Sequence, residues 1–484
     1  MHIPSHFRHT KIIFTVGPST AAPDMLRTLI RERVDVCRIN MAHADEAWTR
    51  SIMANLRQAC RDEGREIATM IDVKGPEIRT GNLPEPVELK IGDTVEFWTT
   101  EPENHRDGST LRISVNYEGL PRDLSPGATM LVDSGLIQLK VNDCTDDRVR
   151  ATVTIPGTMG SKRHINLPGV EIRMPSLTEK DRNDVRIGVE EGVDLIALSF
   201  VRNAQAVHEL REYLCKLGSH ARIISKIEDQ TGLGNLSDII QASDAIMIAR
   251  GDLGIEISYE KLPSIQYQCV KLCQKYGRPV IVATHMLESM ISAPVPTRAE
   301  VSDVANAVRE QADCVMLSGE TTMGSYPLEA VRVMKQVIQA TEAVQHEHQL
   351  NHQIALKTPK AKMLRSAALL AEEMGGASIV VFTRSGFLPH VLAALRPHGI
   401  PIYAFTDIQH IFRRLIPLWG VEPFRIEFNN ADPEMTIKHS FAKLVNGGWC
   451  KTGDPLVVIT NVLAHGEIID TLQLRKIPET LESS

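Results

Sequence analysis

Eight short apolar segments recur between residues 11 and 318, and this repetition constrains the fold more than any other feature. They are KIIFTV (11–16), DVCRIN (35–40), IATMIDV (67–73), DLIALSF (194–200), ARIISKI (221–227), DAIMIA (244–249), PVIVAT (279–284) and DCVMLS (313–318). Such segments, rich in Val and Ile without regular polar alternation, are typical of strands buried on both faces. Helix-like stretches separate most of them, so the sequence predicts a parallel (β/α)8 TIM barrel.

One interval between these strands is much longer than the others. Neighbouring strands are roughly 25–35 residues apart, as in βα units, but roughly 120 residues separate the third from the fourth. Inside that interval the runs VELKIGDTVEF, STLRISV and MLVDSGLIQLKV are strand-like, with PG, DG and SG turn signals between them. We therefore expect a small β-barrel inserted at the C-terminal face of the main barrel, where it would cover an active site as a lid.

A second open α/β domain is expected after a polar, His-rich linker region that begins near residue 340. Helix and strand patterns resume there, as in MLRSAALLAEEM, ASIVVFT, IPIYAFT and DPLVVIT. The predicted domain limits are 1–75 and 175–340 for the barrel, 76–174 for the lid, and 341–484 for the C-terminal domain.

Composition excludes several classes of protein. A net charge of -7 argues against a dedicated nucleic-acid binder. No run approaches 18 uninterrupted apolar residues, and the start MHIPSHFRHT lacks the apolar core of a signal peptide. The eight cysteines form no Cys-x-x-Cys pair, and several lie in apolar segments. We therefore expect a cytoplasmic protein with reduced thiols and no membrane partner.

Polar residues gather where most of the barrel strands end, which is where barrel enzymes build their active sites. They are Arg38 and Asn40, Asp72 and Lys74, Lys226 and Glu228, Arg250 to Asp252, Thr284, and Ser318 to Thr321. A single residue of this kind is more often a cap or a surface ion pair. Six polar strand ends together favour a functional site.

The charges at these strand ends indicate phosphoryl-transfer chemistry. Glu228 and Asp252 end neighbouring strands, and two convergent carboxylates suit Mg²⁺, which leaves room for substrate oxygens. Cations beside a carboxylate-held metal stabilise a transferring phosphoryl group. The candidate cations are Arg38, Lys74, Arg79 and Lys226.

Many of these segments, in order, resemble pyruvate kinases. They include IDVKGPEIRTG, INLPGVEIRMPSLTEKD, ISKIED, ARGDLGIEI, VATHMLESM, PTRAEVSDVANAV and VMLSGETTMGSYPLEAV. The resemblance covers roughly residues 10–340 and, more weakly, the C-terminal domain. It implies phosphoryl transfer from phosphoenolpyruvate to ADP, giving pyruvate and ATP in glycolysis, by a Mg²⁺- or Mn²⁺-dependent homotetramer.

The resemblance also implies a role for each matching residue. The catalytic positions are Lys226, Arg38 and Thr284; substrate would bind Arg38, Gly251, Asp252 and Thr284; and nucleotide would bind Asn40, His43, Arg79, Lys162 and Arg163. Glu228 and Asp252 match the Mg²⁺ ligands, and Asp133 matches a lid aspartate that closes toward the metal. Thr284 with ordered water is a hypothesis for proton delivery to the enolate.

The chain departs from this family at a K⁺ site. Asn40, Asp72 and the Val73 carbonyl match possible K⁺ ligands, but Ala42 replaces a serine that commonly supplies a hydroxyl. Glu77 keeps the form usual in K⁺-requiring members. We expect a weakened or altered requirement for monovalent cations.

Two further departures leave alternatives open. His285 stands where glutamine is usual, and either tunes the pH response of the site or is a packing substitution. In TRSGFLPH (383–390), Thr383, Ser385 and Gly386 resemble a sugar-phosphate effector loop, whose usual arginine is Phe387 here. The loop could equally be a simple strand–turn–helix connection.

Two other functions remain possible on the same scaffold. One is a different Mg²⁺–enolate enzyme, such as an aldolase or lyase, because barrels host many chemistries. The other is a catalytically silent homologue, for which Ala42 is the best support.

Overall fold

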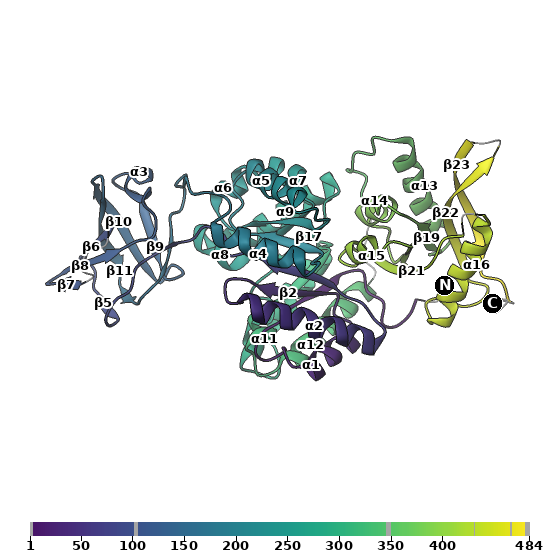
Figure 1. The fold of residues 1–484 in the computed structure, drawn as a ribbon, viewed down its shortest axis with the longest axis horizontal. Helices are drawn as coiled ribbons and strands as arrows, with labels where there is room; N and C mark the ends of the chain where they lie inside the picture. The colour runs from purple at the N-terminus through teal and green to yellow at the C-terminus, as the bar shows by residue number, and fades with distance from the viewer. Residues whose placement is uncertain (1–2, 101–104, 345–349, 430, 465–466, 480–484) are drawn as a thin grey trace.

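The protein has three parts arranged along its longest axis, with the barrel between the lid and the C-terminal domain (Figure 1). The computed structural model describes residues 3–100, 105–344, 350–429, 431–464 and 467–479. The predicted fold class is confirmed. The exact domain limits stay a prediction.

The central barrel is closed by eight parallel strands, in the order β1-β18-β17-β16-β15-β14-β3-β2. These strands are β1 (Lys11–Thr15), β2 (Val36–Asn40), β3 (Ala68–Asp72), β14 (Leu195–Leu198), β15 (Arg222–Ile227), β16 (Ala245–Ala249), β17 (Val280–Ala283) and β18 (Cys314–Leu317). Pairing of Lys11 with Cys314 joins the first strand to the last.

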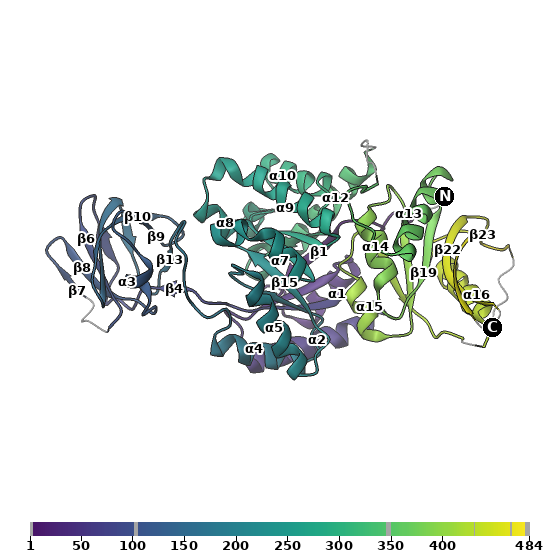
Figure 2. The same cartoon turned by 90° about the horizontal axis from the view of Figure 1, so that it is seen from above.

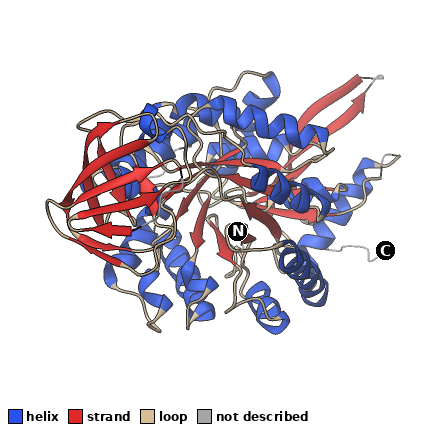
Figure 3. Cartoon of the chain, turned by 60° about the vertical axis from the view of Figure 1, so that its left-hand side comes forward, coloured by secondary structure: helices blue, strands red, loops and turns tan. Residues whose placement is uncertain are grey.

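Helices surround the barrel, as the blue and red elements of Figure 3 show. The barrel helices are α1 (Pro23–Arg31), α2 (Glu46–Glu63), α4 (Glu179–Glu190), α5 (Ala204–Lys216), α6 (Gln230–Gly234), α7 (Leu236–Ala242), α8 (Arg250–Glu256), α9 (Leu262–Tyr276), α10 (Arg298–Arg309), α11 (Gly319–Thr322) and α12 (Pro327–Ala343), with 3-10 turns η1 (Tyr259–Lys261) and η2 (Glu288–Ile291). One apolar cluster fills the layer between strands and helices, and a smaller one includes inward-facing residues such as Ile13, Met70 and Met247.

Five of the eight barrel strands end earlier than predicted, and the other three end at the predicted residue. The strand predicted to reach residue 200 ends at Leu198, and the one predicted to reach Thr284 ends at Ala283. Phe200 and Thr284 have φ angles of 52° and 68°, so the chain leaves the ladder there. Side chains other than glycine rarely adopt this conformation, and it is concentrated at functional sites.

The lid follows β3, leads into α4 and stands out from the barrel at one end of the molecule (Figure 2). Its elements are β4 (Ile78–Arg79), β5 (Val87–Leu89), β6 (Thr94–Trp98), β7 (His105–Asp107), β8 (Thr110–Ser114), α3 (Leu120–Asp123), β9 (Thr129–Val132), β10 (Ile137–Cys144), β11 (Arg148–Ile155), β12 (Gly157–Met159) and β13 (His164–Asn166). Its largest sheet runs β4-β13-β9-β10-β11-β6-β8-β7, and a bridge between Thr80 and Val115 links β4 to the end of β8. The sheet therefore curls around its own apolar core.

The base of the lid contacts the barrel beside the carboxyl ends of its strands. Asn166 Nδ2 donates a hydrogen bond of 3.2 Å to Glu256 Oε1 of α8. The rings of His164 and Phe200 lie 5.9 Å apart. These contacts place the lid next to the predicted active site.

The C-terminal domain is an open sheet in the order β21-β20-β19-β22-β23. Its elements are α13 (Pro359–Glu373), β19 (Ser378–Phe382), α14 (Phe387–Leu395), β20 (Ile402–Thr406), α15 (Gln409–Leu415), β21 (Val421–Arg425), α16 (Pro433–Asn446), β22 (Pro455–Ala464) and β23 (Glu467–Lys476). The patterns did not predict β21, β23 or α15. Both strands lie at sheet edges, and β21 contains Pro423, which an edge tolerates.

The cysteines and the helix lengths bear on two further expectations. All eight cysteines are free thiols, five of them buried, whereas Cys215 is exposed. Each helix in the described parts of the chain is too short or too polar to cross a bilayer. Residues 345–349 of the predicted linker lie outside the described residues.

Candidate active site

Three charged residues meet at the carboxyl ends of β2, β3 and β15. Arg38 Nε donates to Asp72 Oδ2 at 2.7 Å, and Arg38 Nη1 donates to Thr15 Oγ1 at 3.0 Å. Lys226 Nζ donates to Asp72 Oδ1 at 3.1 Å. Asp72 is only 1% exposed, and its buried carboxylate holds the side chains of Arg38 and Lys226 in place. The predicted grouping of Arg38 and Lys226 is present, with Asp72 as its anchor.

Ser199 belongs to the hydrogen-bond network of Asp72 and Lys226, although no sequence pattern pointed to it. Its hydroxyl accepts from Lys226 Nζ at 2.8 Å and donates to the Val73 carbonyl at 2.7 Å. The available signal was its place just beyond the fourth strand, beside the positive-φ residue Phe200.

The charges around Lys226 keep it protonated. Burial alone would lower its pKa, but the carboxylates of Asp72 and Glu228 outweigh burial and raise it. For Asp72, burial acts to raise the pKa, and Lys226 and Arg38 outweigh it so that the pKa falls below its usual value. The site therefore holds a permanent cation on an ionised carboxylate, as stabilisation of a phosphoryl group requires.

Glu228 and Asp252 form the candidate metal site. Glu228 Oε1 lies 3.0 Å from Lys226 Nζ, and Oε2 accepts from the Phe200 N–H at 2.7 Å. Burial, and then the charge of Asp252, raise the pKa of Glu228 to about 7, against the opposing effect of Lys226. A divalent cation between the two carboxylates would remove the repulsion that Asp252 exerts on Glu228.

These two carboxylates would not enclose a metal by themselves. In the described parts of the chain, no three His, Cys, Asp or Glu side chains are grouped closely enough to hold an ion. A pair of carboxylates with open positions is the arrangement that Mg²⁺ uses when substrate and water complete its shell.

Gly251 and Thr284 form a second polar group beside this pair. The Gly251 N–H donates to Thr284 Oγ1 at 2.7 Å, and that hydroxyl donates to the Ala283 carbonyl at 2.6 Å. A Cβ at position 251 would lie 3.4 Å from Thr284 Oγ1 and 3.6 Å from His285 Cε1. A Cβ at this position would therefore make only ordinary contacts, and the short hydrogen bond between the Gly251 N–H and Thr284 does not by itself require glycine.

Arg250 explains why a buried strand finishes with a charged residue. Its guanidinium is buried behind the site, where Nη2 donates to the Thr284 carbonyl at 2.6 Å. Nη1 pairs with Asp303 of α10 at 2.7 Å. Arg250 thus ties the positive-φ turn at Thr284 to a neighbouring helix and acts as a positioning residue.

His285 is not a core packing residue. Its side chain is 58% exposed, and Nε2 lies 3.6 Å from Glu288 Oε2. The alternative role in the pH response stays a prediction.

The candidate K⁺ ligands lie together, but their oxygens have other partners. Asn40 and Asp72 are paired in register. Asn40 Oδ1 accepts from the Ala42 N–H at 3.1 Å, and the Val73 carbonyl accepts from Ser199. Ala42 supplies no oxygen from its side chain.

The predicted nucleotide residues divide between barrel and lid. Arg79 Nη1 donates to the Lys162 carbonyl at 2.8 Å, and Arg163 Nη1 lies 3.1 Å from Asp133 Oδ1. His43 is exposed on the barrel side, just beyond β2. The structure brings Arg79 and Lys162 together.

The predicted effector loop is a tight turn before α14. Thr383 Oγ1 accepts from the Gly386 N–H at 2.9 Å, and Ser385 Oγ accepts from the Phe387 N–H at 3.3 Å. The hydroxyl groups of Thr383 and Ser385, which were predicted to bind a phosphate, therefore already accept hydrogen bonds from backbone N–H groups of the turn.

Known proteins of similar sequence identify the family to which this chain belongs. The pyruvate kinase barrel domain matches residues 7–331, and the pyruvate kinase alpha/beta domain matches residues 361–473. Plastidial pyruvate kinase 2 of Arabidopsis thaliana is 41% identical over 481 residues, which cover 98% of this chain and 82% of that protein. Pyruvate kinase of Geobacillus stearothermophilus is 41% identical over 467 residues, covering 95% and 78% respectively.

A solved structure agrees over nearly the whole fold. A crystal structure of a pyruvate kinase from Cryptosporidium parvum has a TM-score of 0.90 and 33% identity, and covers 97% of this chain and 96% of that one. Domains, sequence and site geometry agree, and the chain belongs to the pyruvate kinase family.

Proposed function

We propose that this site transfers the phosphoryl group of phosphoenolpyruvate to ADP, yielding pyruvate and ATP, with Lys226 and Arg38 neutralising the transferred group. The observation that carries this proposal is the position of Lys226 Nζ, within 3.1 Å of Asp72, Glu228 and Ser199. In such a transfer the protein contributes mainly positioning and charge neutralisation.

Glu228 and Asp252 would hold Mg²⁺, or Mn²⁺ in its place. When bound, the ion neutralises the charge that develops on phosphoryl oxygens. The carboxylate end of the substrate would face Gly251, Asp252 and the Thr284 hydroxyl. Thr284 with an ordered water is also the proposed route for a proton to the enolate carbon.

The nucleotide would lie between barrel and lid. Asn40 and His43 would contact it from the barrel, and Arg79, Lys162 and Arg163 from the lid side. Movement of the lid would carry Asp133 and its partner Arg163 toward the bound substrates, which excludes water during transfer.

A glycolytic, cytoplasmic homotetramer remains part of this proposal rather than a finding. The relative from Arabidopsis thaliana is named plastidial, so the compartment of this chain is open to test. The comparisons give no support for an aldolase or lyase, and the grouped Arg38, Lys226, Glu228 and Asp252 argue against a silent homologue.

The decisive test measures pyruvate formation from phosphoenolpyruvate and ADP with Mg²⁺. We expect activity in the natural chain and a loss of roughly 100- to 1,000-fold in Lys226→Met, the magnitude typical of electrostatic catalytic groups. Lys271→Met, which removes a half-buried lysine of α9, is the matched control and should keep activity. No pyruvate from folded protein that still binds Mg²⁺ would contradict the proposal.

The same assay, run with and without K⁺, tests the altered cation site. Because Ala42 offers no hydroxyl, we expect weak K⁺ activation in the natural chain and stronger activation in Ala42→Ser. Strong K⁺ activation that is identical in both proteins would show that position 42 does not matter.

A further inference from the structure

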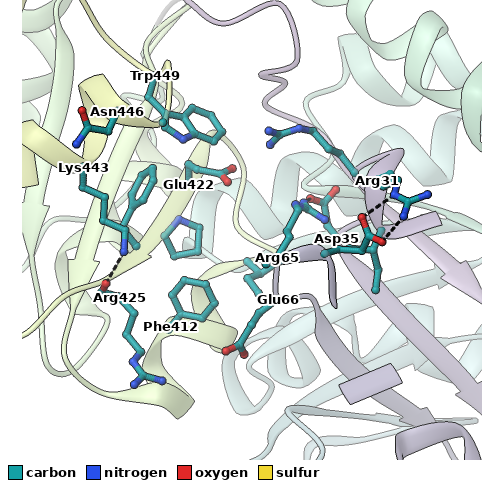
Figure 4. Close-up of a pocket in the computed structure, with 18 of the residues that line it drawn as sticks. Arg31, Asp35, Arg65, Glu66, Phe412, Glu422, Arg425, Lys443, Asn446 and Trp449 are labelled. Carbon is teal, nitrogen blue, oxygen red and sulfur yellow. Dashed lines mark hydrogen bonds and ion pairs between the residues drawn. The ribbon is translucent and has the colours of Figure 1, made fainter. Parts of the chain in front are cut away.

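Two cavities of about 260 Å³ or more lie between the base of the barrel and the C-terminal domain. The larger, about 990 Å³, is lined by side chains of both charges, several of which are already paired (Figure 4). Arg31 there pairs with Glu63, and Arg65 pairs with Asp35. The smaller cavity, about 260 Å³, has three arginines but only one carboxylate among its lining residues.

The walls of the smaller cavity are mainly apolar. One wall comes from the amino-terminal ends of β14 to β18, opposite the active site, and the other from α14, α15 and the loop before α14. Its apolar lining includes Leu195, Ile224, Ile281, Phe387, Ile411 and Leu415. A body of rings or branched carbons would fit against such walls.

Three arginines rim this cavity: Arg222, Arg278 and Arg414. Asp244 is the one carboxylate among its lining residues. That carboxylate is already saturated, because it accepts from Arg211 at 3.1 Å, Arg222 at 3.0 Å and the Ile223 N–H at 2.9 Å. We define these three arginines and the apolar walls as the arginine-rimmed cavity.

Arg278 and Arg414 meet only neutral acceptors among the described residues. Arg278 Nη2 donates to the Gln241 carbonyl at 3.2 Å, and Arg414 donates to the His220 carbonyl. Burial, and then the like charge of Arg222, lower the pKa of Arg414 to about 10. Burial also lowers the pKa of Arg278, and Arg211 and Arg222 add to that effect against Asp244.

The two remaining titratable side chains of the wall, Cys314 and His390, add no countercharge. Burial raises the pKa of the Cys314 thiol, which keeps it neutral. His390 Nε2 donates to the Gly277 carbonyl at 2.8 Å. Its pKa is lowered by burial and then by Arg278, so the ring is neutral at physiological pH. A half-buried rim of three arginines with one carboxylate keeps an excess of positive charge above apolar walls, and it is complementary to an amphipathic anion.

We propose that the arginine-rimmed cavity binds a compact organic carboxylate whose apolar body lies against the walls and whose anionic group pairs with Arg278 and Arg414. The site is distinct from the active site, since it lies at the opposite ends of the barrel strands. Ser385, Gly386 and Phe387 line one wall. Two residues of the loop predicted to bind a sugar phosphate, Ser385 and Gly386, would therefore contact this ligand instead.

The test uses naphthalene-1-carboxylate and its neutral isostere naphthalene-1-carboxamide, titrated into the full chain by calorimetry. We expect the carboxylate to bind saturably at one site per chain, and the carboxamide to bind at least 10-fold more weakly. Equal affinity for the two compounds, or no saturable binding of either, would overturn the proposal.

Variants locate the binding site. Arg278→Met and Arg414→Met should each weaken carboxylate binding at least 10-fold, whereas Arg182→Met, on the exposed face of α4, should not change it. Phe387→Trp narrows the cavity from a 42% exposed position and should weaken binding without disturbing the core. Full affinity in Phe387→Trp and in either folded arginine variant would place the compound elsewhere, at the active site for example, and would overturn the proposal.

Discussion

Arg250 and Thr284 show how a single buried side chain can set the geometry of a reacting group. The guanidinium holds the Thr284 carbonyl and Asp303 at once. These two interactions stabilise the backbone of Thr284, whose φ is 68°. Such a conformation costs about 1–3 kcal/mol at a residue other than glycine.

We therefore predict that Arg250→Met raises the KM for phosphoenolpyruvate and lowers kcat/KM by roughly 10–100-fold. The reason is that a small displacement of the Thr284 hydroxyl from its position beside the substrate slows the reaction strongly. Arg250→Lys should not restore activity, since one ammonium cannot replace the guanidinium fork. Steady-state kinetics provides the measurement, with Arg309→Met on α10 as the control. A lower kcat with an unchanged KM would indicate lost active protein rather than lost positioning.

Asp194 gives a prediction about pH and stability. It is buried at the base of β14, accepts from the Thr69 N–H at 2.8 Å, and burial raises its pKa to about 6 despite Arg413 and Thr69. Because the folded pKa exceeds the unfolded value, its protonated form favours folding below pH 4, and this contribution is lost as pH rises through 6.

Asp194→Asn should remove that pH dependence. We expect the free energy of unfolding of the natural chain to fall by about 2 kcal/mol between pH 4 and 7 through this group, and the variant to lack that component. Urea denaturation at the two pH values measures the difference. Parallel pH profiles for both proteins would contradict the assignment.

Sequence patterns predicted which residues lie at the strand ends but not what each side chain contacts. Arg38, Lys226 and Glu228 were found because residues two apart on a strand share a face. The pattern could not show that Arg250 points behind the site or that Ser199 completes it, since both depend on turns beyond the ladder.

At the scale of elements, the connection from β3 to the lid depends on Gly75. Its φ is +72°, and a Cβ there would lie 2.9 Å from Ser199 Cβ, whose hydroxyl contacts Lys226. Gly64, at the end of α2, has a similar φ of +61° with nothing within 4 Å of such a Cβ.

These two glycines form a matched pair. Gly64→Ala should cost about 1–2 kcal/mol through backbone conformation alone and leave activity unchanged. Gly75→Ala should cost more and lower kcat/KM at least 10-fold, because Ser199 must move. Thermal unfolding and kinetics on both variants test this, and equal activity in the two would argue against a link between the lid connection and Lys226.

The elements themselves were predictable to different degrees. The barrel strands carry a strong signal because both faces are buried, and all eight were found. Edge strands such as β21 and β23 need no continuous apolar run, so their patterns are weak.

At the scale of the whole molecule, the proposed homotetramer would bury apolar side chains that are exposed in one chain. Tyr259 is 85% exposed, Met323 74% and Tyr267 51%. Sedimentation should give about four times the chain mass of 53.7 kDa. Tyr267→Asp should shift the protein toward smaller species, whereas Ile91→Asp, at a 72% exposed position on the lid, should not. A monomer in the natural chain would contradict this part of the proposal.

Pairing of β1 with β18 also bears on how the chain reaches its native state during synthesis. The ribosome must release more than 300 residues before Lys11 can pair with Cys314. The lid strands, from Ile78 to Asn166, have all their sheet partners within one another and can fold long before then. We expect the lid of the nascent chain to fold while the barrel is still incomplete. Lys226 and Asp72 would therefore come together late, so the active site would form after the lid that covers it.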